Sequence, residues 1–285
     1  MKKYTYEQNG LTMRETKWGI LLSANAVVLE LIDLLNEKAK YLGSVFGRTV
    51  FIGQGLNLTK DHIVEKITVK RFPFIRPALV PFVTNEDHAQ FELTSTERFI
   101  VNKAKLSSSE QNLLISNGVK LFDPDSTRKV PPVLILPRGI GRHYCTLNRI
   151  NAFSASAVDI YDYSNNMKEE DKLNLWIYLN SSVCWLLREV SGRKNLGGGM
   201  LKAEATDLKK FPLYMNFQRQ NLVLSIYNQL IKRSAMPILE EIQTIEHQQI
   251  DNLVFNYLGI SNELRKNIIT ELVTQVENRQ GKSRT

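Results

Sequence analysis

Residues 176–213 read WIYLNSSVCWLLREVSGRKNLGGGMLKAEATDLKKFPL, an apolar run followed by a basic loop, three consecutive glycines and a turn that contains a proline. Large apolar residues recur in and just before this stretch at every third or fourth position, which predicts one helix with a buried face. They are Leu173, Trp176, Ile177, Val183, Cys184, Leu187 and Val190. Asn180 shares this apolar face, and Gly192 is expected to end the helix. Arg193 and Lys194 then offer charges that suit phosphate.

The composition is that of a globular protein with a basic surface. The 285 residues are 43% hydrophobic and 23% charged, and the net charge of +8 favours an anionic partner such as nucleic acid. No Asp or Glu occurs between residues 126 and 158, where Arg128, Lys129, Arg138, Arg142 and Arg149 fall. A second basic group consists of Arg188, Arg193, Lys194, Lys202, Lys209 and Lys210.

The cysteines and the hydropathy pattern indicate in which cellular compartment the protein is expected. Cys145 and Cys184 are the two cysteines of the chain, and their spacing suits neither a disulfide framework nor a zinc knuckle. No apolar run reaches the length of a membrane span or of a signal-peptide core. We therefore expect a cytoplasmic protein with no membrane partner.

The order of elements predicts an α+β fold. A helix that Ser23 caps is expected to end at Leu42–Gly43. Short β-branched and aromatic runs between turn signals then predict strands at residues 48–52, 62–69, 98–101, 132–136, 144–150 and 157–161. After Phe217 three amphipathic helices follow, the second opened by Pro237 and ended by Gly259, and the third capped by Ser261. The tail from residue 279 is expected to fray.

This order implies three parts. They are a helical lead-in at residues 1–44, an α+β domain with a mixed or antiparallel sheet and a packed central helix at 45–215, and a helical C-terminal module at 216–285. No alternation of strands and helices supports a doubly wound nucleotide-binding fold.

Tests for enzyme chemistry yield one weak candidate. The chain has no methyltransferase cofactor loop, and the glycines at 197–199 lack the Lys-Ser or Lys-Thr that completes a phosphate-binding loop. The four histidines show no metal-ligand spacing. Asp125 with Glu170 and Lys172 formally matches the metal-binding pattern of many endonucleases. However, Asp125 falls in a predicted turn, and Glu170 is explained as a carboxylate at a helix N-terminus. We therefore expect neither a catalytic nor a metal site in this chain. A metal-dependent endonuclease that uses these three residues remains the alternative.

The basic residues are the remaining candidates for function. On a functional interpretation they line a cleft that follows a phosphate backbone, and some reach base edges. The predicted DNA-binding residues are Arg138, Arg142, Arg149, Arg193, Lys194 and Lys202. The alternative is an ordinary solvated surface with a positive bias.

Several short segments, in this order, resemble the target-recognition domain of restriction-modification systems. The resemblance is to the C-terminal region of type II adenine-specific DNA methyltransferases and of methyltransferase-nuclease fusions. Its strongest part is Leu179-Asn180-Ser181-Ser182, followed by the glycines Gly197, Gly198 and Gly199 and then by residues 207–213. Weaker parts are residues 42–45, 51–57, 75–77, 136–139, 153–156, 249–255, 258–260 and 276–279. At residues 44 and 54, Ser and Gln stand where the family more often has an acid and Thr.

The resemblance implies a module that recognises a specific double-stranded DNA sequence and has no catalytic centre of its own. It would position a methyltransferase or nuclease partner, to which S-adenosylmethionine and Mg²⁺ would belong. Asn180 and the glycines would then have structural roles, because a buried amide must find hydrogen-bond partners and glycines let a strand fold back tightly. A scaffold that docks a partner through the helices at residues 222–276 is a further alternative.

Overall fold

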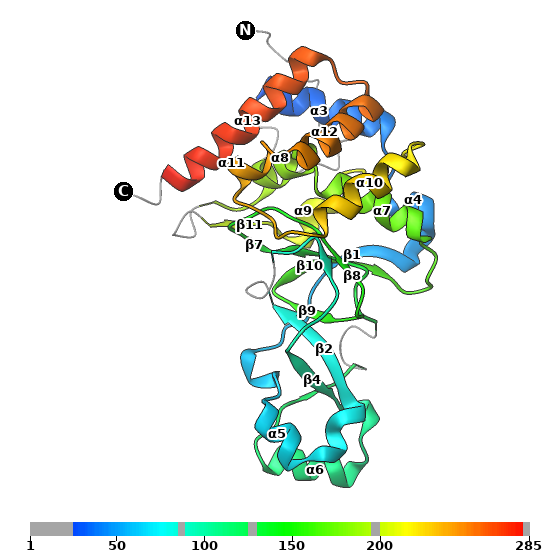
Figure 1. Ribbon diagram of the computed structural model, residues 1–285, viewed down its shortest axis with the longest axis vertical. Helices are drawn as coiled ribbons and strands as arrows, with labels where there is room; N and C mark the ends of the chain where they lie inside the picture. The colour runs from blue at the N-terminus through cyan, green and yellow to red at the C-terminus, as the bar shows by residue number, and fades with distance from the viewer. Residues whose placement is uncertain (1–24, 85–88, 125–129, 195–199, 282–285) are drawn as a thin grey trace, which may run out of the picture.

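The computed structural model describes residues 25–84, 89–124, 130–194 and 200–281 (Figure 1). Its α-helices are α3 (Ala26–Lys38), α4 (Leu42–Phe46), α5 (Lys66–Arg71), α6 (Ser108–Ser116), α7 (Glu169–Leu179), α8 (Ser182–Ser191), α9 (Ala205–Leu208), α10 (Gln220–Leu230), α11 (Ile238–Glu241), α12 (Ile245–Leu258) and α13 (Asn262–Gly281). The 3₁₀ turns are η1 (Gly47–Thr49), η2 (Lys60–His62), η3 (Pro73–Ala78) and η4 (Lys103–Lys105). Within these ranges no helix is long and apolar enough to cross a membrane.

The strands form three sheets. They are β1 (Val50–Gln54), β2 (Leu79–Thr84), β3 (Glu92–Leu93), β4 (Phe99–Asn102), β5 (Leu121–Phe122), β6 (Leu134–Pro137), β7 (Gly139–Ile140), β8 (Thr146–Asn148), β9 (Phe153–Ala155), β10 (Ala157–Asp162) and β11 (Leu201–Lys202). The largest sheet has the order β1-β10-β6-β8-β3 and is antiparallel except for the parallel pair β8 and β3. The second has the order β5-β4-β2-β9, and the third pairs β11 with β7. The predicted α+β class with a mixed sheet is confirmed.

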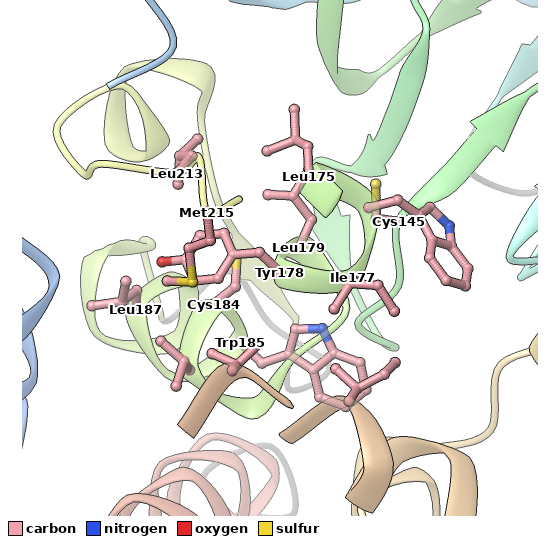
Figure 2. Close-up of a cluster of buried hydrophobic side chains, with 14 of the residues drawn as sticks. Cys145, Leu175, Ile177, Tyr178, Leu179, Cys184, Trp185, Leu187, Leu213 and Met215 are labelled. Carbon is pink, nitrogen blue, oxygen red and sulfur yellow. The ribbon is translucent and has the colours of Figure 1, made fainter. Parts of the chain in front are cut away.

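Helices α3, α7, α8 and α10 to α13 gather on one side of the five-stranded sheet, whereas α5 and α6 lie at the opposite end of the molecule (Figure 1). One hydrophobic cluster contains buried residues of α3, of this sheet, of α7 and α8, and of α10 to α13. Figure 2 shows its middle, where Tyr178, Cys184 and Leu187 lie beside Leu213 and Met215. The first described helix and the C-terminal helices therefore pack on the same core as the central helices.

Elements β2, β4, β5, α5, α6 and η2 to η4 form a distal lobe, which we define as residues 57–84 and 94–124. It extends away from the helices of the main core in Figure 1. A small hydrophobic cluster around Ile75 lies within the lobe, and a second cluster around Phe82 also includes Leu56, Phe153 and Ala155 from outside it. Gly55 lies at the junction between β1 and the lobe, and a Cβ at this position would come within 2.6 Å of Ser154 Oγ and 2.8 Å of Ser154 O. Ser156, in the left-handed region at φ 57°, joins β9 to β10 and so joins the two larger sheets.

Several expectations about elements were wrong. The helix expected between Pro237 and Gly259 is two helices, α11 and α12, separated by residues 242–244. The apolar run of residues 173–190 is not one helix but two, because α7 ends at Asn180 and Ser181 caps α8 by accepting a hydrogen bond from Cys184 N. Residues 62–69, expected as a strand, instead run from the end of η2 at His62 through a short connection into α5. Arg279 does not lie in a frayed tail: it is buried inside α13, which continues to Gly281.

Local signals placed several boundaries correctly. Gly192 is the C-cap of α8, and Gly259 ends α12 in the left-handed conformation at φ 67°. Ser261 Oγ accepts a hydrogen bond from Leu264 N at the start of α13. The first helix differs from the expectation: Asn25, whose Oδ1 accepts from Val28 N, is the N-cap of α3, and α3 ends at Lys38 instead of at Leu42–Gly43, where α4 begins. Ser23, which was expected to be the cap, lies outside the described residues.

Candidate nucleic-acid interface

Three of the six predicted DNA-binding residues converge on one carboxylate. β11 pairs with β7 so that Lys202 lies opposite Gly139, and Ala203 N donates to Arg138 O at 3.0 Å. Arg193 joins the same ribbon through backbone hydrogen bonds with Lys202 in both directions. The carboxylate is that of Glu204, two residues after the end of β11.

The side chains around Glu204 form a compact set. Arg138 donates to both carboxylate oxygens, each at 2.8 Å, which is the bidentate geometry that guanidinium favours. Lys202 Nζ lies 3.3 Å and Arg193 Nη2 3.4 Å from Oε1, and Gln54 Nε2 donates to Oε2 at 2.5 Å. We refer to these five residues as the Glu204 cluster.

The cluster is electrostatically unbalanced towards positive charge. The hydrogen bond from Arg138 is the main cause that lowers the pKa of Glu204, so this carboxylate is ionised at neutral pH. Three cations face one anion, which leaves two positive charges. The side chain of Glu204 is 6% exposed and that of Arg193 is 68% exposed. Arg193 is therefore the cation that a phosphate can reach most easily, whereas Arg138 is held by the carboxylate.

The other three predicted DNA-binding residues do not join this cluster. Arg142 is exposed and donates to Ala235 O at 3.1 Å. Arg149 donates to Glu92 at 2.7 Å and to the Tyr227 hydroxyl at 3.0 Å, and it also pairs with Glu169 at the start of α7. Lys194 donates to Gln275 on α13. The sequence analysis therefore placed six cations in one cleft, whereas the structure brings three of them together at Glu204 and places the other three elsewhere.

Buried charged residues hold the strand segment that carries Arg138. Arg188 of α8 donates to Pro137 O, and Arg279 of α13 donates to Ile140 O at 3.2 Å. Glu189 accepts from Arg279 Nε at 3.1 Å and Nη2 at 2.8 Å. Arg188 and Glu189 are 1% and 0% exposed, so this support lies inside the protein. Sequence reasoning missed Glu189, Gln54 and Glu204 as site residues. Arg279 is 90 residues from Glu189, and Gln54 and Arg138 are 150 and 66 residues from Glu204.

His143 belongs to the same buried network. Its Nε2 lies 2.9 Å from Glu189 Oε1, and its ring stacks on Trp185. Burial lowers the pKa of His143 to about 4, against the raising effect of Glu189, so the ring is neutral at pH 7. His143 and His247, two of the four histidines of the chain, are buried, and both rings lie against Trp185.

Ser182, His247 and Asp251 have the composition of a catalytic triad but a different geometry. Asp251 accepts from both Ser182 N at 2.8 Å and Ser182 Oγ at 2.6 Å, so it caps α8. The same His247 nitrogen, Nε2, faces both Ser182 at 2.8 Å and Asp251 at 3.4 Å. A triad needs opposite ring nitrogens for the nucleophile and the acid. All three side chains are buried, so the group is a structural cap.

The endonuclease alternative gains no support from the described residues. Asp125 lies outside them, while Glu170 and Lys172 stand in the first two turns of α7, where Glu170 is one of three acidic residues at the helix start. Within the described ranges no three His, Cys, Asp or Glu side chains are placed to hold a metal ion.

Asn180, part of the motif that resembles the recognition domain, has a defined set of hydrogen-bond partners. Asn180 is fully buried, accepts from Cys145 N at 2.8 Å, and donates to Cys145 O at 3.1 Å and to Trp176 O at 3.0 Å. It therefore ties the end of α7 to the segment that enters β8. Gly197, Gly198 and Gly199 lie outside the described residues.

Two solved structures are similar to the chain. The type IIG restriction endonuclease BpuSI matches with a TM-score of 0.63 and 12% identity, over 94% of this chain and 34% of that one. The type IIL restriction-modification enzyme MmeI, solved in complex with DNA, matches with a TM-score of 0.43 and 12% identity, over 81% and 35%. No family model and no curated protein sequence matches. The chain spans about a third of the length of each structure, and the likeness to BpuSI shows a shared fold.

Proposed function

We propose that this chain is a sequence-specific double-stranded DNA recognition module of a restriction-modification system. It positions a methyltransferase or nuclease, either as a separate subunit or as a part of a longer enzyme, and has no catalytic centre of its own. The observation that carries the proposal is the fold that 94% of the chain shares with about a third of a restriction endonuclease. The motifs at residues 179–182 and 207–213 agree with it.

The Glu204 cluster supplies the phosphate contacts in this proposal. Arg193 and Lys202 bind the DNA backbone, while Glu204 keeps Arg138 and Gln54 in fixed positions beside them. Phosphate contacts set the register of a protein on a duplex but carry no sequence information. Specificity is therefore assigned to loop side chains near the cluster. S-adenosylmethionine and Mg²⁺ would act in the partner.

The test is the salt dependence of duplex binding, measured by fluorescence anisotropy with a labelled duplex of random sequence. Each lost phosphate contact lowers the slope of log affinity against log salt by about 0.9. We expect Arg193→Ala with Lys202→Ala to lower the slope by about 1.8 and to weaken binding. The matched control is Lys232→Ala with Lys266→Ala, which removes the same charge from exposed positions outside the cluster.

Two results would contradict the proposal. One is equal affinity and equal slope for the cluster variant, the control variant and the wild type. The other is Mg²⁺-dependent cleavage of plasmid DNA by the chain alone, abolished by Asp125→Ala, since that would place a nuclease centre in this chain.

A further inference from the structure

The distal lobe carries a basic surface that the Glu204 cluster does not explain. The lobe contains nine Lys or Arg against five Asp or Glu. Two of the cations are neutralised locally, since Lys120 pairs with Asp61 at 2.7 Å and Lys103 with Asp123 at 2.9 Å. The positive excess of the lobe therefore resides mainly on α5 and on the turns around it.

The exposed side of α5 combines charge with one apolar side chain. Val69 packs on the core of the lobe, and the positions that point away from it are Lys66, Ile67, Lys70 and Arg71. Ile67 is 69% exposed and stands between the two lysines. Arg71 is anchored, because it donates to Asn117 at 2.7 Å and lies over the ring of Phe72.

The packing of the lobe core does not require the exposed position of Ile67. The helix has six residues, and its inner side already covers the lobe core through Val69. A single exposed isoleucine is common on protein surfaces. An isoleucine flanked by lysines one turn apart, however, offers phosphate contacts on both sides of a group that can touch a thymine methyl in the major groove.

We propose that Lys66, Ile67 and Lys70 form a second DNA-contacting surface, which we call the α5 face. Lys66 and Lys70 bind phosphates, and Ile67 enters the groove between them. The inference rests on the proposed function, because it takes the same duplex as the ligand. In Figure 1 α5 and the β7–β11 ribbon lie towards the same side of the view, at different heights along the long axis. In this proposal one duplex contacts both the lobe and the Glu204 cluster.

The charges at the α5 face are tested by Lys66→Ala with Lys70→Ala in the full chain, with the random-sequence duplex. Both side chains are exposed, so the variant is expected to fold, which circular dichroism verifies. We expect the salt slope to fall by about 1.8, and the affinity at 0.1 M salt to fall more than about tenfold. The control Lys232→Ala with Lys266→Ala should leave both quantities near the wild-type values.

The apolar contact is tested by Ile67→Ser on a duplex enriched by selection from a random pool. A groove contact predicts about a fivefold loss of affinity for the enriched duplex. The salt slope should stay unchanged, because no charge is removed. An equal affinity of Ile67→Ser and wild type for that duplex would overturn the groove contact.

The outcomes separate this inference from the proposed function. If the lysine variant binds DNA as the wild type does while the Glu204-cluster variant is impaired, the α5 face is refuted and the proposed function stands. If the wild type binds no duplex, both fail. Loss of binding to phosphatidylserine vesicles in the lysine variant, with DNA affinity unchanged, would assign the face to a membrane and overturn the inference.

Discussion

Replacing Glu189 by Gln should destabilise the protein strongly, because this carboxylate is the anion of a buried network. It accepts two hydrogen bonds from Arg279 and one from His143. Gln keeps the size of the side chain but has one acceptor oxygen, and its NH₂ group would face an N–H donor of Arg279. The guanidinium would then be left buried without a counter-charge.

The magnitude follows from the pKa. Burial alone would raise the pKa of Glu189, but the hydrogen bonds from His143 and Arg279, together with the charge of Arg279, lower it from 4.5 to about 2. At 1.36 kcal/mol per pH unit this difference corresponds to about 3 kcal/mol of stability at neutral pH. Removing one partner of a buried ion pair typically costs about 3–5 kcal/mol, which agrees.

Urea unfolding at pH 7, followed by tryptophan fluorescence and circular dichroism, measures the effect. We expect Glu189→Gln to lower the free energy of unfolding by about 3 kcal/mol. The exposed Glu240→Gln on α11 serves as the control and should change it by less than about 0.5 kcal/mol. Because the folded pKa is below the unfolded value, the deficit of the variant should narrow as pH falls from 4.5 towards 2. A deficit under about 1 kcal/mol at pH 7 would refute the assignment of Glu189 as the anion that balances Arg279.

Three further results are expected. Burial lowers the pKa of His143 from 6.5 to about 4, so the free energy of unfolding of the wild type should fall as the pH drops through this range. His143→Gln should reduce the slope of unfolding free energy against pH by up to about 1.4 kcal/mol per pH unit. An unchanged slope in this variant would contradict the expectation. Gly55→Ala should cost about 1–3 kcal/mol in urea unfolding, because its Cβ would clash with Ser154; a neutral effect would mean that the junction yields easily. Glu204→Gln should strengthen non-specific duplex binding several-fold, because it leaves the cluster one charge more positive. Weaker binding by a folded variant would contradict this, and would mean that Glu204 acts mainly by holding Arg138 in position.

The parts of the fold that depend on local signals were predictable. The helical spacing of Leu264, Ile268 and Leu272, together with the cap at Ser261, placed α13 without knowledge of its partners. The break between α7 and α8 was not predictable, because the apolar spacing continues through Asn180. The side chain of Asn180, at the end of α7, hydrogen-bonds to Cys145, which lies 35 residues away, and the sequence does not show this contact.

The candidate site was predictable only in part, for the same reason. Arg138, Arg193 and Lys202 were chosen for their charge, and the structure does bring them together. Their common partner Glu204 is 66 residues from Arg138, and the two meet because two-residue strands pair. Strands of two residues carry too little sequence pattern to be predicted. The prediction of a strand at residues 62–69 was wrong because β-branched residues favour strands, whereas in the structure Val69 lies on a short helix and packs on the lobe core.

Selection of duplexes from a random-sequence pool by the purified chain tests the central claim most directly. The account predicts that repeated rounds enrich one short consensus sequence, and that the enriched duplex binds at least about a thousandfold more tightly than random duplex at physiological salt. A pool that remains random after several rounds, with equal affinity for all duplexes, would contradict sequence-specific recognition by this chain.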